Sequence, residues 1–448
     1  MLWKILLGFA GLGIVVFVHE LGHFLAARLV GIDVEAFSIG WGKPVLKKTV
    51  RGTEYRLGLF PLGGYCKMKG ENEFQEAWEK KQASITPSPG SFFGVGPFRR
   101  ILVSFAGPFF NLVFAVLVFA VIWGMGFEVD TLENRIILAS DMSPGESYPA
   151  DGAGLRTGDR ILAINGNETP YYHDVREGIS INPGKNLSLV VDREGEHLDI
   201  SIMPELDKQT GAGKIGVYFW TDPVLDSVTG PAAAAGLQSG DRILRVNGED
   251  LPHTLALAKI MEGQPQELKL DYERNGLQGE ITLIPAYTET GAELGLSYRS
   301  LRYRAPPLSL PGALSRGIGE TWKTLVVSLE SLVLLFKGID LTQAVSGPLR
   351  ITYMTGDIAA AGFSESIGAG FSSLANFLAL ISIALCVMNL LPLPVLDGGA
   401  IVLYLIEAIK RKPLHPRTIS AFQAVGVVLI FGLLIFAVFG DILYLVRH

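Results

Sequence analysis

The chain has 448 residues, of which 49% are hydrophobic and 18% charged, and its formal net charge at pH 7 is -6. With a mean hydropathy of +0.35 it is too apolar for an average soluble enzyme, and the composition fits several membrane spans joined to a soluble part. The acidic balance excludes nucleic acid as an expected partner, and the two cysteines, Cys66 and Cys386, predict no disulfide framework.

The first predicted element is a membrane-spanning helix in residues 1–30, with no charge between Lys4 and His19. It ends on the H-E-x-x-H motif His19-Glu20-Leu21-Gly22-His23. On a helix the two imidazoles share one face and can bind one metal ion, while Glu20 lies about 100° round the helix, where it can act as a general base. Polar side chains at membrane depth are costly, so the motif predicts metal chemistry inside a membrane rather than a cleaved signal peptide.

The next two predicted elements are a polar loop in residues 31–99 and a second span in residues 100–127. In the loop, Tyr55 to Met68 alternates around Pro61-Leu62-Gly63-Gly64 and predicts a β-hairpin, with an ordinary solvent-exposed hairpin as the alternative to a functional one. The span contains Gly107-Pro108-Phe109-Phe110-Asn111. A small residue permits close helix packing, so packing and substrate contact both remain open for Gly107 and Asn111.

A repeat follows, with Ala153 to Gly166 and Ala235 to Gly248 sharing the pattern A-G-L-x-x-G-D-R-I-L-x-x-N-G. Short alternating strands surround each copy and predict two β-rich domains, in residues 128–220 and 221–305. The pattern resembles bacterial PDZ domains, which bind peptide C-termini by strand addition. Ile215-Gly216-Val217 and Leu294-Gly295-Leu296 are similar to the carboxylate-binding loop of those domains. Which copy each loop serves stays open, because such domains can be circularly permuted, and two ligand-free domains are the alternative.

Residues 306–366 form a region that includes an amphipathic helix between Pro311 and Lys337, where apolar residues recur at helical spacing. We expect this helix on the membrane surface; a fifth span is the alternative, which Glu330 near its middle disfavours. A third span in residues 367–412 and a fourth in residues 413–448 complete the chain.

The third span contains the segment Asn389-Leu390-Leu391-Pro392-Leu393-Pro394-Val395-Leu396-Asp397-Gly398-Gly399. A catalytic zinc requires three protein ligands and an open position for water, and Asp397 is the intramembrane candidate for the third ligand. Pro392 and Pro394 must break the helix, which is tolerated at membrane depth only in a protein-lined or water-filled cavity. Asn389 offers a donor and an acceptor to a peptide backbone, with a hydrogen bond between helices as the alternative.

Lysine and arginine in the short loops predict the orientation of the chain. The 31–99 loop and the connection between spans three and four are rich in both residues, so both should be cytoplasmic. The two β-rich domains then lie on the other side, which for a bacterial inner membrane is the periplasm. His19, His23 and Asp397 reach the same depth, near the cytoplasmic side.

H-E-x-x-H in a first span, combined with N-x-x-P-x-P-x-L-D-G-G in a later one, resembles the site-2 protease family of intramembrane zinc metalloproteases. The resemblance implies one zinc ion per chain, bound by His19, His23 and Asp397, with Glu20 as the general base. It also implies a membrane-associated β-loop whose edge strand receives an extended substrate. The residues expected to contact substrate are Asn389, Pro392, Pro394, Gly107, Asn111, Leu59 and Gly63.

The expected protein is therefore a polytopic α-helical membrane protein of four transmembrane helices, with two periplasmic PDZ domains and a β-hairpin on the membrane. We expect an endopeptidase of the bacterial inner membrane that cleaves single-span proteins in or near their transmembrane segments. The resemblance implies a pre-trimmed anti-sigma factor as substrate, and signal-peptide remnants as further ones. The alternatives are a catalytically silent scaffold that binds partners through its PDZ pair, a transporter with a structural metal, and iron or cobalt in place of zinc.

Overall fold

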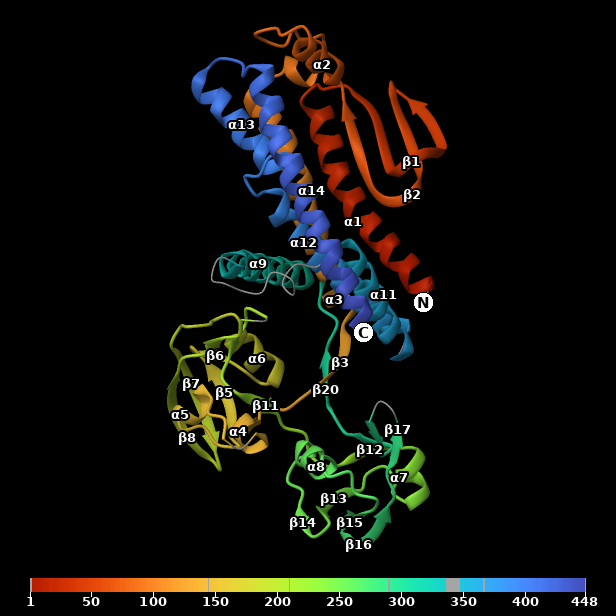
Figure 1. Cartoon of the computed structure of the whole chain (residues 1–448), viewed down its shortest axis with the longest axis vertical. Coiled ribbons are helices and arrows are strands. Elements are labelled where there is room, and N and C mark those ends of the chain that lie inside the picture. Colours follow the sequence, from red (N-terminus) through yellow and green to blue (C-terminus); the bar gives the residue numbers. More distant parts are fainter. Residues whose placement is uncertain are drawn as a thin grey trace. The chain divides into compact units, whose positions relative to one another are not determined.

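The structure of the chain is a computed structural model that describes residues 2–143, 145–208, 210–288, 291–335, 347–365 and 367–447. It divides into two compact units (Figure 1). The first unit, Met1–Phe127 with Ala305–His448, holds the long helices and a sheet. The second unit, Glu128–Arg304, holds the two β-rich domains.

The first unit is mainly helical. Its helices are α1 (Leu2–Leu29), α2 (Glu71–Glu79), α3 (Pro97–Met125), α9 (Leu310–Leu335), α11 (Pro348–Glu365), α12 (Ile367–Asn389), α13 (Asp397–Lys410) and α14 (Pro416–Arg447), with a 3-10 turn at Phe92–Gly94. Among the described residues, four helical segments are long and apolar enough to cross a membrane, namely Leu7–Leu29, Pro97–Met125, Ile367–Asn389 and Pro416–Asp441. The four apolar segments predicted from the sequence are therefore helices.

Helix α3 is the centre of this unit, because it contacts α1, α9, α12 and α13. Glycine lets α1 approach it closely: a Cβ at Gly22 would lie 3.0 Å from the Cβ of Phe110 on α3. An ion pair joins α3 to α13, with Arg100 Nη1 3.2 Å from Glu407 Oε2 and the second guanidinium nitrogen on the other carboxylate oxygen. Both side chains are nearly buried, at 5% and 11% exposure. The ion pair thus adds a polar connection to the packing of α3 against α13.

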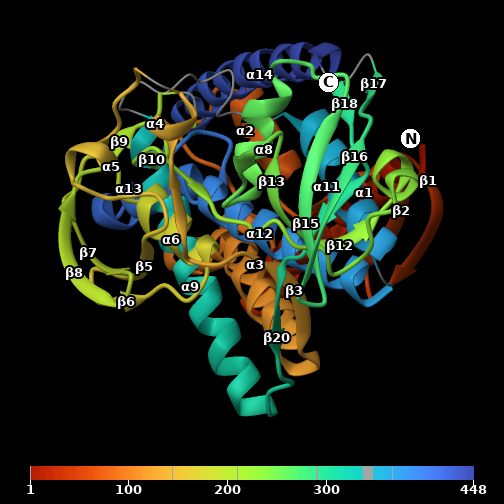
Figure 2. The same cartoon turned by 90° about the horizontal axis from the view of Figure 1, so that it is seen from below.

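Helix α9 covers the described part of the segment from Pro311 to Lys337 that the sequence predicts as an amphipathic helix; residues 336–337 lie outside the described residues. Figure 1 shows it running across the other helices, and Figure 2 shows it beside α3. Gly317 faces the α3 backbone, where a Cβ would lie 3.0 Å from Ala120 N, and Thr321 is buried on the same side. Ile318 and Trp322 are exposed. An apolar stripe outside the contact with α3 is consistent with a helix lying along a bilayer surface.

The third apolar segment is broken where its prolines predict. Helix α12 ends at Asn389, and α13 begins at Asp397. Between them Val395 has a φ of 75°, in the left-handed region. A Cβ at Gly399 would lie 2.7 Å from the Leu393 carbonyl carbon, so the start of α13 folds tightly against the break. The break therefore places Asp397 at the first residue of a new helix.

A sheet built from two long strands, β1 (Val34–Val50) and β2 (Thr53–Met68), follows α1. Each strand bends, so that Phe37 pairs with both Cys66 and Tyr55, while Leu46 pairs with Leu57. The resulting order of segments is 63–68, 34–41, 53–60 and 44–50, with 63–68 and 44–50 at the two edges.

The hairpin predicted within Tyr55 to Met68 is wrong in its pairing. The two halves of that segment flank residues 36–39 of β1 instead of pairing with each other. Gly63, with a φ of 81°, lies in the turn between the two halves of β2, which is wide enough for residues 36–39 of β1 to lie between them. Pairing on both sides of β1 satisfies more backbone groups than a two-stranded hairpin would, which favours this arrangement.

The second unit contains two domains of similar fold, which we name the first and second repeat domains. The first consists of β4 (Ile136–Leu138), α4 (Ala139–Met142), α5 (Pro149–Gly152), β5 (Arg160–Ile164), β6 (Asn167–Glu168), α6 (Tyr172–Ser180), β7 (Leu187–Arg193), β8 (Glu196–Ile202), β9 (Glu205–Leu206), β10 (Gly213–Lys214) and β11 (Val217–Phe219). The second consists of β12 (Leu225–Val228), α7 (Gly230–Ala235), β13 (Arg242–Val246), β14 (Glu249–Asp250), α8 (Thr254–Met261), β15 (Leu268–Arg274), β16 (Leu277–Leu283), β17 (Ala286–Thr288), β18 (Gly291–Glu293) and β19 (Leu296–Tyr298). Strands β3 (Phe127–Thr131) and β20 (Leu301–Ala305) pair where the chain enters and leaves this unit.

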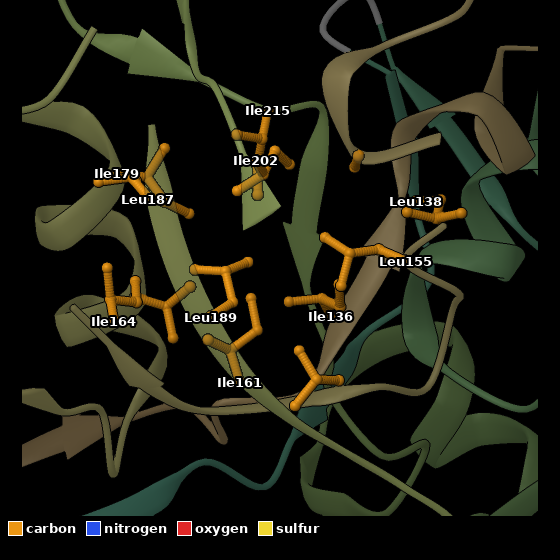
Figure 3. Packing of buried hydrophobic residues seen from close by; sticks show 13 residues of the cluster. Ile136, Leu138, Leu155, Ile161, Ile164, Ile179, Leu187, Leu189, Ile202 and Ile215 are labelled. Carbon is orange, nitrogen blue, oxygen red and sulfur yellow. The ribbon is translucent and has the colours of Figure 1, made fainter. Parts of the chain in front are cut away.

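Each repeat domain is built on a four-stranded sheet, in the order β6-β5-β7-β8 in the first and β14-β13-β15-β16 in the second. Figure 3 shows the core of the first domain, where Ile161, Leu187 and Leu189 are fully buried. The aspartate of the repeated Gly-Asp sequence binds an arginine in each domain. Arg193 Nε donates to Asp159 Oδ1 at 2.8 Å in the first, and Arg274 Nε donates to Asp241 Oδ1 at 2.6 Å in the second. Burial acts to raise the pKa of Asp241, but the hydrogen bonds from Arg274 hold it below its usual range.

The sequence did not decide which repeat domain each of the two glycine-containing loops belongs to, and the structure does. Ile215 belongs to the core of the first repeat domain, and β11 pairs with β4. Leu294 and Leu296 pack on the core of the second, and β19 pairs with β12. Each loop thus serves the domain that precedes it in the chain.

Candidate metal centre

Helices α1 and α13 bring together two imidazoles and a carboxylate. Candidate ligand atoms of His19, His23 and Asp397 all lie within 4.8 Å of one another. His19 Nε2 is 3.2 Å from Asp397 Oδ2, and His23 Nε2 is 3.4 Å from Asp397 Oδ1. The two Nε2 atoms are 3.1 Å apart. Three donors therefore converge on one point, as the H-E-x-x-H spacing and the position of Asp397 predict.

The remaining nitrogens of both imidazoles face α3. His23 Nδ1 is 2.8 Å from the carbonyl oxygen of Val103, and His19 Nδ1 is 3.3 Å from the amide of Asn111. An imidazole whose Nδ1–H is held by an acceptor presents its Nε2 lone pair to a metal. Both histidines are only 8% exposed.

Gly107 lies between these two contacts on α3. A Cβ built there would lie 2.7 Å from His23 Cε1 and 2.8 Å from His19 Cε1, closer than side-chain carbons approach in proteins. The absence of a side chain at this position lets α3 lie directly against both imidazoles. Of the two roles left open for Gly107, the geometry supports packing.

Glu20 lines the same cavity as the three ligands. The cavity has a volume of about 480 Å³. Besides the ligands and Glu20, its lining includes Cys66, Met68, Lys69, Gly70, Glu71, Phe92, Phe93, Val103, Ser104, Asn389, Val395, Leu396, Tyr404 and Gln423. A Cβ at Gly64 would lie 3.6 Å from Glu20 Cγ, so the edge segment 63–68 runs beside the carboxylate.

The donor set fits a catalytic zinc ion. Two imidazole nitrogens and one carboxylate are one of the known catalytic sets, and they leave a coordination position free. Zinc held there supplies a Lewis acid that lowers the pKa of a coordinated water and stabilises negative charge on a carbonyl oxygen. Glu20 can accept the proton of the attacking water at a carboxylate oxygen and deliver it to the departing nitrogen. Asp397, at the start of α13, is stabilised as an anion by the helix terminus.

Of the residues predicted to contact substrate, some lie at the catalytic cavity and others do not. Asn389 lines the cavity, beside the break that contains Pro392 and Pro394, and Pro394 packs against Gly426 of α14. Asn111 is fully buried and touches His19.

The two predicted residues of the β-loop lie on either side of its bend. Leu59 is 59% exposed on segment 53–60, which residues 34–41 separate from the edge beside Glu20. Gly63 begins the edge segment, next to Trp41.

Sequence reasoning missed several groups at this site. The carbonyl of Val103 is a backbone acceptor, so its residue type carries no signal. Tyr404 lies two helical turns after Asp397 on α13, and Gln423 comes from α14; both line the cavity. The i, i+4 spacing from Val103 through Gly107 to Asn111 was the one available signal, since it places all three on one face of α3.

Comparison with known proteins extends these observations to the whole chain. The model of peptidase family M50 matches residues 7–433. A protein of Treponema pallidum (strain Nichols), whose name describes a zinc metalloprotease, is 37% identical over 446 residues, covering 99% of both chains. "Regulator of sigma E protease" of Haemophilus influenzae is 31% identical over 480 residues, again covering 99% of both.

The solved structures that the chain is similar to include PDZ domains. One, from an SdrC-like protein of Listeria monocytogenes, covers 18% of this chain and 84% of its own at 18% identity, with a TM-score of 0.15. These values do not establish a shared fold, so the PDZ assignment stays a prediction. The family match, in contrast, includes all three candidate metal ligands. Because that match and the full-length relatives agree with the donor set around Glu20, the chain belongs to peptidase family M50, as a zinc metalloendopeptidase.

Proposed function

We propose that this peptidase uses one zinc ion per chain to cleave single-span membrane proteins within or near their transmembrane segments. The observation that carries the proposal is the position of His19, Glu20 and His23 inside Leu7–Leu29, a helix long and apolar enough to cross a bilayer. A catalytic cluster at that place meets substrates that are themselves in the membrane. The basic residues of the 31–99 loop and of the connection between spans three and four support a site near the cytoplasmic face of a bacterial inner membrane.

A transmembrane helix must be unwound before water can attack, because its carbonyls are engaged in helical hydrogen bonds. Segment 63–68 offers a sheet edge to which an extended peptide can add as a further strand. This edge runs beside Glu20, and Cys66 and Met68 on it line the catalytic cavity. We therefore assign substrate pairing to residues 63–68, in place of the segment around Leu59.

Cys66 allows this pairing to be tested by disulfide cross-linking. In a Cys386→Ala, Glu20→Gln background Cys66 is the sole cysteine, since the chain has two. Single cysteines placed along the cleavage region of a substrate should cross-link to Cys66 at alternate positions, because strand side chains alternate between faces. The products are read by non-reducing electrophoresis. The control places the cysteine at Leu46 on the opposite edge, in a chain whose Cys66 is also replaced by Ala, and should give no cross-link. Equal cross-linking to both edges would contradict the assignment.

The repeat domains act in this proposal as PDZ domains on the periplasmic side, controlling which substrates reach the site. The paired G-D-R-I-L-x-x-N-G segments and the glycine loops support the assignment. In the same proposal the metal centre is near the cytoplasmic face, as the basic loops suggest. Domains so placed cannot supply chemistry, but they exclude bulky ectodomains. A substrate already trimmed on the periplasmic side, such as an anti-sigma factor, passes them, and signal-peptide remnants are small enough to do the same.

Excision of the second unit tests both the proposed activity and the proposed exclusion of bulky substrates by the repeat domains, which we call the gate. Phe127 and Ala305 belong to the paired strands β3 and β20, so a short linker can join them after removal of Glu128–Arg304. In proteoliposomes we expect the excised enzyme to cleave a trimmed substrate at near the parent rate and an untrimmed one faster than the parent does. Products are identified by mass spectrometry. If the parent cleaves neither substrate in its transmembrane region, the proposed function fails; if the excised enzyme still rejects the untrimmed substrate, the gate lies elsewhere.

A further inference from the structure

We propose that Asn111 is a positioning residue for the metal centre, which holds His19 in the tautomer that binds zinc. The side chain is fully buried on α3, and its amide is 3.3 Å from His19 Nδ1. It does not line the catalytic cavity, in contrast to Asn389. The inference depends on the metal centre and not on which substrate is cleaved.

The tautomer follows from the position of the other ligands. His19 Nε2 points at Asp397 and at His23 Nε2, so Nε2 is the nitrogen that binds metal. A metal-binding Nε2 must present its lone pair, and in the neutral ring the proton then resides on Nδ1. His19 Nδ1 is therefore a donor and requires an acceptor. The only polar side chain recorded within hydrogen-bond distance of it, among the described residues, is the amide of Asn111.

The amide can meet this requirement in only one of its two orientations. With Nδ2 next to His19 Nδ1, two donors would face each other, while Asn111 Oδ1 finds no partner among the described residues. Rotation by 180° exchanges the two amide atoms in nearly the same volume and turns Oδ1 toward the imidazole. Either orientation leaves one amide atom without a partner, so the contact with His19 Nδ1, a donor when Nε2 binds metal, decides between them. The geometry thus assigns Oδ1 as the acceptor of the Nδ1–H bond.

The same face of α3 orients both imidazoles. Val103 accepts from His23 Nδ1 through its carbonyl, Gly107 leaves room for both rings, and Asn111 accepts from His19. Helix α12 fixes this part of α3, because Ser382 Oγ donates to the Asn111 carbonyl at 3.0 Å. A backbone carbonyl and a side-chain amide thus do for two histidines what carboxylates often do in other zinc sites.

The test is the zinc dissociation constant of the purified full-length chain, measured by competition with a chromophoric chelator. Asn111→Leu keeps the volume and removes the acceptor, and should weaken zinc binding by about 10- to 100-fold. Asn111→Asp keeps an acceptor and should stay within about threefold of the parent or bind more tightly. Asn376→Leu is the matched control: it removes an exposed amide on α12, away from the lining of the catalytic cavity, and should leave the dissociation constant unchanged.

Two results would overturn the assignment. Parent-like zinc affinity in Asn111→Leu would mean that the amide only fills space, and equal losses in the Leu and Asp variants would mean that acceptor character is not what matters. If Asn111→Leu does not give a folded protein, Asn111→Ala replaces it in the same comparison. Zinc affinity is read without substrate, so failure of this inference leaves the proposed cleavage of membrane proteins untouched.

Discussion

Glu20→Gln is expected to bind zinc like the parent while losing cleavage by about 10²- to 10⁴-fold, the usual contribution of a general base. The amide keeps the shape of the side chain but cannot take a proton from water. His23→Ala and Asp397→Ala should lose both zinc and cleavage, because each removes one of three converging donors. Metal content is measured by mass spectrometry on the purified protein, and turnover on a substrate in proteoliposomes.

The control for this series is Glu76→Gln, which neutralises an exposed carboxylate on α2 that pairs with Lys80. It should change neither zinc content nor turnover, since exposed pairs of this kind contribute little. Loss of zinc in Glu20→Gln would show that Glu20 is a ligand. Full turnover in the same variant would place the base on another residue.

Gly107→Ala should remove most zinc binding and cleavage although it adds a single methyl group. That methyl would lie 2.7 Å from His23 Cε1 and 2.8 Å from His19 Cε1, so α3 or both rings must move. A displacement of about 1 Å in a catalytic group can cost on the order of 100-fold in rate. The expected result is a fall in zinc affinity together with a rate loss of at least that order.

Gly124→Ala on the same helix provides a matched control. Its added Cβ would meet only Ala313 Cβ at 3.7 Å, an ordinary contact, so zinc binding and turnover should be unchanged. Both variants carry the same chemical change in the same helix and differ only in what the methyl group meets. Parent-like behaviour of Gly107→Ala would contradict the close approach of α3 to the imidazoles.

The convergence of the three candidate metal ligands was predictable because its signal is in residue type and spacing. His19 and His23 must share a helix face at i, i+4, and Asp397 is an acidic residue at the end of a long uncharged run. The helix break was predictable for a similar reason, since Pro392 and Pro394 lack the donors that a helix requires. In each case a local physical constraint acts on a named side chain.

The sheet after α1 and the contacts from α3 were not predictable in the same way. The alternating pattern around Gly63 fits a local hairpin equally well as two strands that flank residues 36–39. Which of the two forms depends on pairing with β1, which is distant in the sequence. The Val103 carbonyl has no side-chain signature. Asn111 was recognised as significant, but its place next to His19 depends on how deeply α3 packs against α1.

The Arg100–Glu407 pair has a consequence for how the enzyme responds to chelation. Removing one partner of a buried, doubly hydrogen-bonded ion pair typically costs about 3–5 kcal/mol, because the other charge is left buried without a partner, so separating α3 from α13 at this place is unfavourable. It holds the helix that begins with Asp397 through contacts that involve no metal. In zinc fingers, by comparison, the ion itself supplies the folding free energy. In this peptidase we therefore expect demetallation and unfolding to be separate events, with the apoprotein keeping a shape into which the ion can return.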